Sequence, residues 1–334
     1  MFFLGKFRIH YPSQIAILML LFITAALRAQ NADDKAVDEP TRHPAIQAKL
    51  LIGLPGIDSG SYGDLSFNSR TLQFTTRDAS FKVAKVNILS VSDGDEQVEL
   101  GGVAGKFART AIPYGGGYVL GAVAHKKVGL LTMEFVDASG QYHGAVFLMK
   151  SQDSAAVISA LSLKVVARAT PQPVTAPACS ASEQTLNTVK VETISADAPS
   201  SFPSEDRVLL YERLVERLQS EKSIEHVYRS GDQSSQAQCA AFSIKVSPMA
   251  FTKGNQALRA SVGPLGHFVG TTKLSYHLTI TTRDGTSLFD DDLKKSEGAD
   301  SDSLNITKFV SKTVVKDLRR SQSHLRKGQA AQAI

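Results

Sequence analysis

Histidine and glutamate side chains between residues 125 and 143 are the first in this chain that could support chemistry. His125, Glu134 and His143 fall on or near neighbouring predicted strands, so they could approach one another. A zinc site requires three or four ligands that converge at about 2 Å from the metal. No local ligand spacing such as His-Glu-x-x-His accompanies these residues. We therefore predict that they belong to strand faces and that the chain carries no metal site.

Two glycine-rich segments share parts of catalytic motifs. The segment 56–61 places serines beside glycines but lacks the Gly-x-Ser-x-Gly pattern of a nucleophile elbow. The segment 101–107 contains a Gly-Lys pair, but a phosphate-binding loop needs glycine where Leu100 stands and a hydroxyl residue where Phe107 stands. The sequence therefore provides no catalytic motif and no cofactor site, although dispersed residues can still converge in a folded chain.

A glycine-rich loop in the second half of the chain is the predicted contact with a ligand or partner. Gly263, Gly266 and Gly270 are closely spaced around His267. Glycines at such spacing let a backbone approach a ligand or another chain closely. Arg259 would supply the accompanying charge. The alternative is a tight turn followed by a bulge.

A basic stripe lies near the C-terminus. Lys308, Lys312 and Lys316 recur every four residues in a predicted helix, and Arg319 and Arg320 follow. This spacing places the side chains on one face of a helix. Such a face attracts anionic lipid or polysaccharide. The alternative is an ordinary solvated face.

The two cysteines, Cys179 and Cys239, are the remaining reactive side chains. Neither has the close partner that a Cys-x-x-Cys redox or metal motif requires. An even pair in an exported protein can form a disulfide, which here would close a loop of about 60 residues. The alternative is a pair of free thiols.

Residues 1–29 have the layout of a secretory signal peptide, with a basic head, an apolar middle and a small residue at the exit. The apolar run 15–27 covers about 20 Å as a helix, whereas a bilayer core is about 30 Å thick. We therefore predict export, to the periplasm or the outer envelope, with cleavage after Ala29. The alternative is an uncleaved N-terminal anchor.

Positive charge is concentrated at the two ends of the chain, whose formal net charge is +5. Residues 1–29 hold three lysines and arginines and no acidic residue, and residues 305–334 hold seven against one. The body between them is therefore net acidic. A nucleic-acid-binding domain needs a basic patch on a folded face, so we expect no nucleic-acid partner.

Residues 48–167 form a module dominated by predicted strands, after a lead-in, 30–47, that is predicted to be disordered. Apolar and polar residues alternate around the polar residues 68–70, which predicts a hairpin. The residues 92–94 predict another turn. Further apolar strands are predicted at 81–88, 118–123, 130–135 and 142–149, and a helix at 151–165.

This order of hairpin-linked strands and one terminal helix resembles a pleckstrin-homology-like or GRAM-like domain. The matching segments are 63–67, 71–74, 81–83, 88–91, 131–135 and 144–147. The resemblance implies a strongly bent antiparallel sheet that is plugged by its C-terminal helix. A glycine-rich insert at 101–117 departs from a compact version of that fold.

A second module follows a linker, residues 168–186, whose Ala, Pro, Ser and Thr cannot build a core. Residues 187–320 predict an α+β module, and the residues 321–334 are predicted to form a disordered basic tail. The predicted strands are 189–191, 224–228, 240–246 and 271–282, with helices that begin near 203 and 303. The residues 283–286 predict a tight hairpin turn.

The second module resembles an uncharacterised bacterial envelope family, a domain of unknown function frequent on exported proteins and lipoproteins. The matching residues are 253–259, 262–263, Gly266, Gly270, 274–282 and 284–285. The architecture of that family is similar to the α/β domain of curli-secretion lipoproteins. The resemblance implies an envelope role and supplies no catalytic residue. The lipoprotein cysteine of many such relatives is missing here.

These observations predict an exported α+β protein of two modules with a non-enzymatic binding or assembly role in the bacterial cell envelope. The expected partner is an envelope protein or a cell-surface component, with anionic lipid or polysaccharide at the basic stripe. Two alternatives stay open. One is an envelope hydrolase with a site between the modules, and the other is a peripheral membrane protein bound through its basic C-terminal helix.

Overall fold

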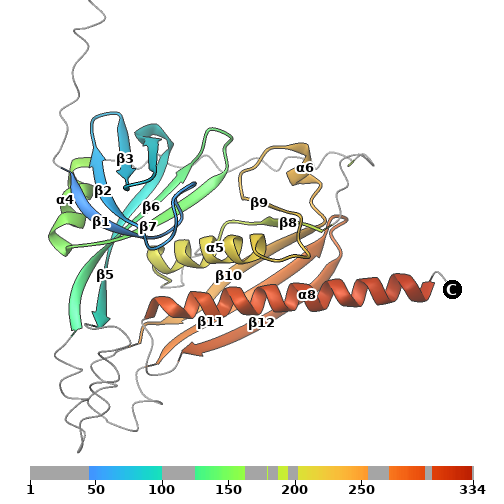
Figure 1. The fold of residues 1–334 in the computed structure, drawn as a ribbon. Helices are drawn as coiled ribbons and strands as arrows, with labels where there is room; N and C mark the ends of the chain where they lie inside the picture. Colours follow the sequence, from blue (N-terminus) through green and yellow to red (C-terminus); the bar gives the residue numbers. More distant parts are fainter. Residues whose placement is uncertain are drawn as a thin grey trace, which may run out of the picture. The chain divides into compact units, whose positions relative to one another are not determined.

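The computed structural model describes residues 45–99, 125–161, 179, 187–194, 202–254, 271–297 and 303–332. These residues form two β-sheets with accompanying helices, which is a mixed α+β architecture (Figure 1). The predicted fold class is confirmed at this level. The leader and the glycine-rich loop 259–270 lie outside the described residues, as does all of the linker except Cys179.

The first sheet has seven antiparallel strands in the order β4-β3-β2-β1-β7-β6-β5. The first and last strands in sequence, β1 and β7, are therefore neighbours, with Lys49 opposite Leu148. The strands are β1 (Ile46–Ile52), β2 (Tyr62–Phe67), β3 (Thr71–Thr75), β4 (Ser80–Ala84), β5 (Ile88–Glu99), β6 (His125–Val136) and β7 (Tyr142–Met149). A short 3-10 helix, η1 (Lys85–Asn87), connects β4 to β5.

The predicted hairpin around residues 68–70 joins β2 to β3. The Asn68 side chain accepts hydrogen bonds from the backbone N–H groups of Arg70 and Thr71, each at 2.8 Å. Asparagine favours such turns because its side chain can satisfy nearby backbone donors. The alternation places Leu65 opposite Phe74 in the core of the sheet. Helix α4 (Ser151–Leu161) then packs Val157 and Leu161 into the same core.

The turn predicted at residues 92–94 is wrong, because these residues lie inside β5. Asp93 pairs with Leu131 and Gly94 pairs with Leu130 of β6. A Cβ atom on Gly94 would lie 2.9 Å from Oε1 of Glu205. The glycine therefore permits close approach by a residue of the second module, and it does not reverse the chain.

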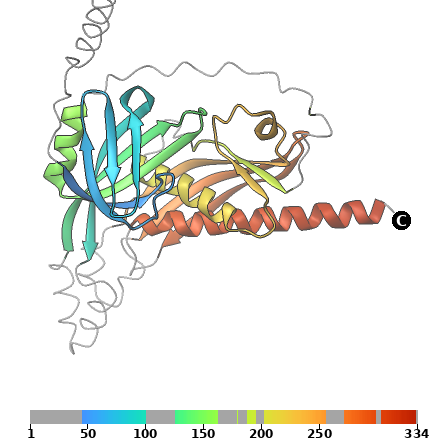
Figure 2. The same ribbon diagram turned by 45° about the horizontal axis from the view of Figure 1, so that its top comes forward.

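The second sheet has five strands in the order β12-β11-β10-β8-β9, and β8 runs parallel to both of its neighbours. Helices α5 and α8 lie on the same side of this sheet (Figures 1 and 2). The elements are β8 (Thr188–Val191), α5 (Ser204–Gln219), β9 (His226–Tyr228), α6 (Ser235–Gln238), β10 (Phe242–Thr252), β11 (Thr272–Thr282), β12 (Ser287–Glu297), η4 (Ser303–Asn305) and α8 (Ile306–Gln332).

The alternating burial along β11 shows that the second sheet has one buried face and one open face. Leu274, Tyr276, Leu278 and Ile280 are fully buried beneath the helices, and the residues between them are not. This period of two is the pattern of an antiparallel sheet with one face on the core. Helix α5 begins after Pro203 with two acidic residues in its first turn, where the helix dipole favours negative charge.

Helix α8 continues to Gln332, beyond the end near Arg320 that the sequence predicted. Residues 321–332 contain no proline, and glutamine, alanine, leucine, lysine and arginine, which are good helix formers, make up most of them. Across the described part of the chain, we find no helix with the length and apolarity that crossing a membrane requires.

Cys179 and Cys239 form a disulfide with an S–S distance of 2.11 Å, so the predicted pairing is present. Cys239 directly follows α6 and is buried. Its carbonyl oxygen accepts a hydrogen bond from Nε of Arg283 at 2.6 Å. The disulfide therefore attaches a residue from the predicted linker to the second module.

Candidate functional site

The two sheets meet along a seam in which α5 packs against β7. Ile52, Leu130 and Val146 of the first sheet share an apolar cluster with Val208 and Leu209 of α5. Gly144 on β7 makes this approach possible, because a Cβ atom there would lie 2.5 Å from Cγ1 of Val208. The seam is therefore a close-packed contact, and it positions the polar groups described next.

A buried ion pair between Glu212 and Arg229 lies at the seam. Nη1 and Nη2 of Arg229 donate to the two carboxylate oxygens of Glu212, both at 2.8 Å. The side chains are only 3% and 14% exposed. Burial lowers the pKa of Arg229, but the adjacent Glu212 carboxylate outweighs it and raises that pKa above its ordinary value. Arg229 therefore keeps its charge, and the carboxylate of Glu212 lies directly against it.

The same ion pair holds the backbone of β7. Oε1 of Glu212 accepts a hydrogen bond from the N–H of Gly144 at 2.9 Å, and Nη1 of Arg229 donates to the carbonyl oxygen of Tyr142 at 3.2 Å. The N–H of Tyr142 donates to the carbonyl oxygen of Ser230 at 2.8 Å. The carboxylate of Glu212 thus has all of its partners within the protein, which is the condition for a stable buried charge.

A second charged contact crosses the seam at Glu134 of β6. Its carboxylate accepts from Arg207 of α5 and from the hydroxyl of Tyr142, the latter at 3.1 Å. Burial raises the pKa of Tyr142 well above its ordinary value, and the charge of Glu134 raises it further. Tyr142 therefore stays protonated and acts as a hydrogen-bond donor.

His143 has a different environment from the paired charges. Its Nε2 lies 3.2 Å from a carboxylate oxygen of Asp137, and its ring stacks on Phe135 with the centroids 5.3 Å apart. Burial lowers the pKa of His143, and the charge of Arg229 lowers it further. A carboxylate can only accept, so the neutral ring carries its proton on Nε2. Nδ1 is then a buried acceptor, and it has no hydrogen-bond partner in the described structure.

A pocket of about 390 Å³ opens at this point of the seam. We call it the seam pocket. It is lined by residues 52–59 from the loop after β1 and by five side chains of the seam: His143, Glu212, Glu216, Gln219 and Arg229. Its volume is within the range of small-molecule sites in proteins. The pocket therefore places His143 beside the Glu212–Arg229 ion pair and beside the acidic residues Asp58 and Glu216.

The seam pocket has the composition of a binding site more than that of a hydrolytic site. A serine, cysteine or threonine nucleophile is activated by a base within hydrogen-bond reach. Among the described residues, no hydroxyl or thiol is hydrogen-bonded to either ring nitrogen of His143. Glu212 is fully engaged with Arg229 and Gly144. The arrangement can accept hydrogen bonds and attract positive charge.

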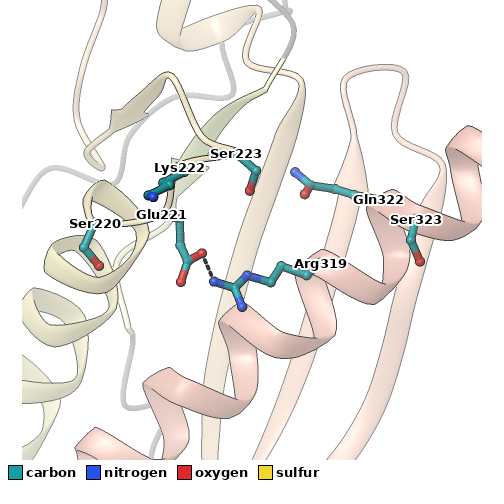
Figure 3. A pocket seen from close by; sticks show the side chains of 7 residues that line it. All are labelled: Ser220, Glu221, Lys222, Ser223, Arg319, Gln322 and Ser323. Atoms are coloured by element: carbon teal, nitrogen blue, oxygen red, sulfur yellow. Dashed lines mark hydrogen bonds and ion pairs between the residues drawn. The ribbon is translucent and has the colours of Figure 1, made fainter.

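A second hollow, a groove of about 770 Å³, lies between α8 and the turn that follows α5 (Figure 3). An ion pair between Arg319 and Glu221 joins its two sides. The amide group of Gln322 points toward the turn that holds Ser223, and its Nε2 has no hydrogen-bond partner within the described chain. Arg319 and Glu221 are paired, and the other residues that line this groove are Lys222, which is exposed, and the neutral polar residues Ser220, Ser223, Gln322 and Ser323.

The structure separates Glu134 from His143, two of the three side chains that the sequence suggested could meet. Glu134 lies opposite Gly144, and His143 lies opposite Phe135, so Glu134 and His143 project from opposite faces of adjacent strands. The side chain of His125 lies outside the described residues. A search of the described residues found no group of three histidine, cysteine or acidic side chains that could hold a metal ion.

The other predicted sites have mixed outcomes. The loop with Arg259, Gly263, Gly266, His267 and Gly270 lies outside the described residues, so its partner role stays a prediction. The basic stripe lies on the exposed side of α8, as Lys308, Lys312, Lys316, Arg319 and Arg320 are all exposed. Arg319 pairs with Glu221, and Arg320 contacts Asp317 at 3.4 Å. Binding by this stripe also stays a prediction.

Sequence reasoning did not find Glu212, Arg229 or the role of His143. The sequence contained one signal for Glu212: it directly follows Tyr211, a residue on the apolar side of α5. An acidic residue beside buried positions of a helix indicates a buried partner. Nothing in the sequence indicates that this partner is Arg229. No family model matches the chain, and no curated protein is significantly similar to it.

Proposed function

We propose that this protein is an exported, non-enzymatic binding or assembly protein of the bacterial cell envelope. The observation that carries the non-enzymatic part is the chemistry of the seam. Glu134 of the first module pairs with Arg207 of the second, and Glu212 pairs with Arg229 within the second. In the described part of the chain, no hydroxyl or thiol is hydrogen-bonded to the ring of His143. These groups hold the modules together and line a pocket, and they are poorly arranged for hydrolysis.

The export part of the proposal rests on two other observations. The leader-like residues 1–29 agree with a disulfide between Cys179 and Cys239, since such bonds persist mainly in oxidising compartments. The strand order of the first sheet, with β1 beside β7 and α4 against the core, supports a pleckstrin-homology-like module. The α+β second module supports the resemblance to the envelope family.

The proposal is tested by photo-cross-linking in intact bacterial cells that express the full chain. A photoreactive residue is placed at Lys245, on the open face of the second sheet, and separately at Lys312, on α8. The matched control is the same residue at Val157, which is fully buried. We expect a light-dependent product of higher mass from an exposed position and none from the control. Recovery of monomer alone from both exposed positions would contradict an assembly role.

A second candidate function, peripheral membrane binding, is favoured by one observation on α8. Phe309 is 51% exposed and lies beside the lysines of the basic stripe. An exposed aromatic residue among lysines is typical of helices that lie on anionic membranes. Co-sedimentation with anionic vesicles tests it, comparing the full chain with Phe309→Ser and with a Lys308→Gln, Lys312→Gln, Lys316→Gln variant. Absence of salt-sensitive vesicle binding by the unmodified chain would exclude this candidate.

A further inference from the structure

Strand β12 is the outer strand of the second sheet, and among the described strands only β11 pairs with it (Figure 1). The pairing with β11 extends from Ser287 to Glu297, so the opposite edge of β12 is long. An edge of this kind presents a row of backbone N–H and C=O groups that can pair with another chain. The residues of β12 therefore decide what this edge can bind.

The hairpin between β11 and β12 shows which backbone groups face the outer edge. It closes with a hydrogen bond from the N–H of Thr282 to the carbonyl oxygen of Thr286, at 2.9 Å. The even-numbered residues of β11 therefore direct their backbone groups toward β12, where they lie opposite odd-numbered residues. The N–H of Asp292 accordingly donates to the carboxylate of its neighbour Asp291, at 2.8 Å. The outward groups of β12 are those of residues 290, 292, 294 and 296.

The charge along β12 changes sign once. Aspartates occupy positions 290–292, Leu293 follows, and lysines occupy positions 294–295. All of these charged residues are exposed except Lys295, which is partly exposed. An edge whose charges had one sign would repel the same edge of a second copy. A strand whose sign reverses about its middle is instead complementary to itself when the second copy runs in the opposite direction.

An antiparallel pair centred on Leu293 matches the charges of both copies. Asp292 then lies opposite Lys294 of the second copy, and Asp291 lies opposite Lys295 of the second copy. Opposite charges across an antiparallel pair are stabilising, and like charges are destabilising. A shift of the centre by one residue would place Asp292 or Lys294 opposite its own counterpart. The charges therefore favour one register.

The faces of the sheet agree with this register. Asp292 lies on the open face, opposite His277, and Asp291 lies on the helix side, opposite the buried Leu278. Each lysine is an even number of residues from its matching aspartate, so it lies on the same face. Oδ1 of Asp292 is 2.8 Å from Nδ1 of His277, which leaves Oδ2 for the lysine of the second copy. A two-fold axis normal to the sheet keeps each face on its own side.

We infer that the outer edge of β12 binds β12 of a second copy of this chain, antiparallel, with Leu293 at the two-fold axis. The outward backbone groups of the two strands pair, and the two five-stranded sheets become one continuous sheet. The N–H of Asp292 then donates to the carbonyl oxygen of Lys294 of the second copy. This frees the Asp291 carboxylate to pair with the facing Lys295.

This inference deepens the proposed assembly role, on which it rests, by naming one partner. It is tested by sedimentation-velocity ultracentrifugation of the full chain. We expect a monomer–dimer equilibrium with a dissociation constant of about 1–100 μM at about 50 mM NaCl, as small interfaces give. At about 500 mM NaCl the dimer should be several-fold weaker, because exposed ion pairs are screened.

A chain that stays monomeric up to about 500 μM would overturn the inference, as would a dimer that salt does not weaken. Either result is distinguishable from failure of the proposed function. Light-dependent products with other envelope proteins in intact cells would still support the assembly role, whereas their absence would not affect a dimer measured with the purified chain.

Charge reversal locates the interface. Asp291→Lys with Asp292→Lys makes the middle of β12 basic, and Lys294→Glu with Lys295→Glu makes it acidic. Each variant alone should self-associate at least about tenfold more weakly, because like charges then face each other. An equimolar mixture should associate about as tightly as the unmodified chain, because opposite charges face each other again in the same register. Unweakened association of either variant alone, or no association in the mixture, would overturn the inference.

Two further variants separate charge from backbone pairing. Lys222→Glu with Lys245→Glu makes the same change of charge at exposed residues outside β12 and should leave the affinity unchanged. Ser296→Pro keeps the charge but removes an outward N–H, which proline allows on an edge strand, and should weaken the dimer about fivefold. Equal weakening by the Lys222 and Lys245 variant, or an unchanged dimer in Ser296→Pro, would also overturn the inference.

Discussion

Glu212 and Arg229 owe their importance to burial. An exposed ion pair contributes little to stability because water already solvates both charges. The Glu212 and Arg229 side chains have left water almost completely and have replaced it with each other and with the backbone of β7. Removal of one partner therefore leaves an uncompensated charge inside the protein, which is more costly than the pair itself is stabilising.

We expect Glu212→Gln to lower the free energy of unfolding by about 3 kcal/mol, because Arg229 would stay buried without its counter-charge. Urea denaturation followed by circular dichroism measures the change. Glu192→Gln is the matched control, since Glu192 pairs with Lys190 at 3.4 Å but is 37% exposed. It should cost less than about 1 kcal/mol. Equal losses in the two variants would show that the seam pair is not specially important.

His277, on the open face of the second sheet, should respond to pH in a predictable direction. Its Nδ1 lies 2.8 Å from Asp292 and its Nε2 lies 2.7 Å from Asp290. The hydrogen bond to Asp292 raises the pKa of His277 above 6.5, and Asp290 adds to this. The stabilisation by protonated His277 is therefore complete below pH about 6.5 and is lost as the pH rises through the raised pKa.

Titration by NMR measures this pKa directly. We expect a value above 6.5 in the unmodified protein and a fall toward 6.5 in the Asp290→Asn, Asp292→Asn variant. The midpoint of urea unfolding of the unmodified protein should show the matching loss of the His277 contribution with rising pH. An unchanged pKa in the double variant would contradict the assignment of these two carboxylates as its cause.

Among the elements, α5 is the helix that packs against both sheets. It covers the second sheet together with α8, and it also packs on β7 of the first sheet. Its residues therefore belong to two cores, with Leu214 and Leu218 in one and Val208 and Leu209 in the other. A helix packed on both sides cannot shift easily to accommodate a larger side chain. Substitutions in β7 that face α5 should therefore lower the free energy of unfolding.

Gly144→Ala tests the contact between α5 and β7. The added methyl group would meet Val208 at 2.5 Å, so we expect a loss of about 1–3 kcal/mol in the free energy of unfolding. The control is a double-mutant cycle with Val208→Ala, which removes the opposing methyl groups. In that background Gly144→Ala should cost at least about 1 kcal/mol less. Additive effects would contradict a direct clash.

For the molecule as a whole, the disulfide provides a connection that no helix or strand provides. It joins Cys179 to Cys239 across a sequence separation of 60 residues. The intervening chain includes β8, α5 and β9. A cross-link of this span restricts the unfolded chain more than the folded one, which stabilises the folded state.

We expect the Cys179→Ser, Cys239→Ser variant to lose about 4 kcal/mol in the free energy of unfolding, as the chain-entropy relation gives for a loop of this length. Urea denaturation with and without a reductant measures the loss. The reductant should destabilise the unmodified protein by a similar amount and leave the variant unchanged. If the reductant has no effect on the unmodified protein, the bond contributes nothing to its stability.

The sequence by itself determined the elements whose causes are local. The hairpin at 68–70 depends on one asparagine side chain, and the strands and α5 follow from periods of 2 and 3.6 residues. The disulfide could be named as one of two outcomes because only two cysteines are present. These features could be predicted because each one is caused by residues that are close together in the sequence, or by the amino-acid composition.

Only the tertiary structure decided the seam and its pocket. Gly94 resembled a turn residue because its cause, the approach of Glu205, is more than a hundred positions away. Arg229 meets Glu212 because the chain after β9 returns to α5, and His143 of β7 lines the same pocket because α5 packs on β7. Which side chains become neutral, charged or unpartnered depends on burial and on the neighbours that the fold supplies, and neither is present in a local pattern of residues.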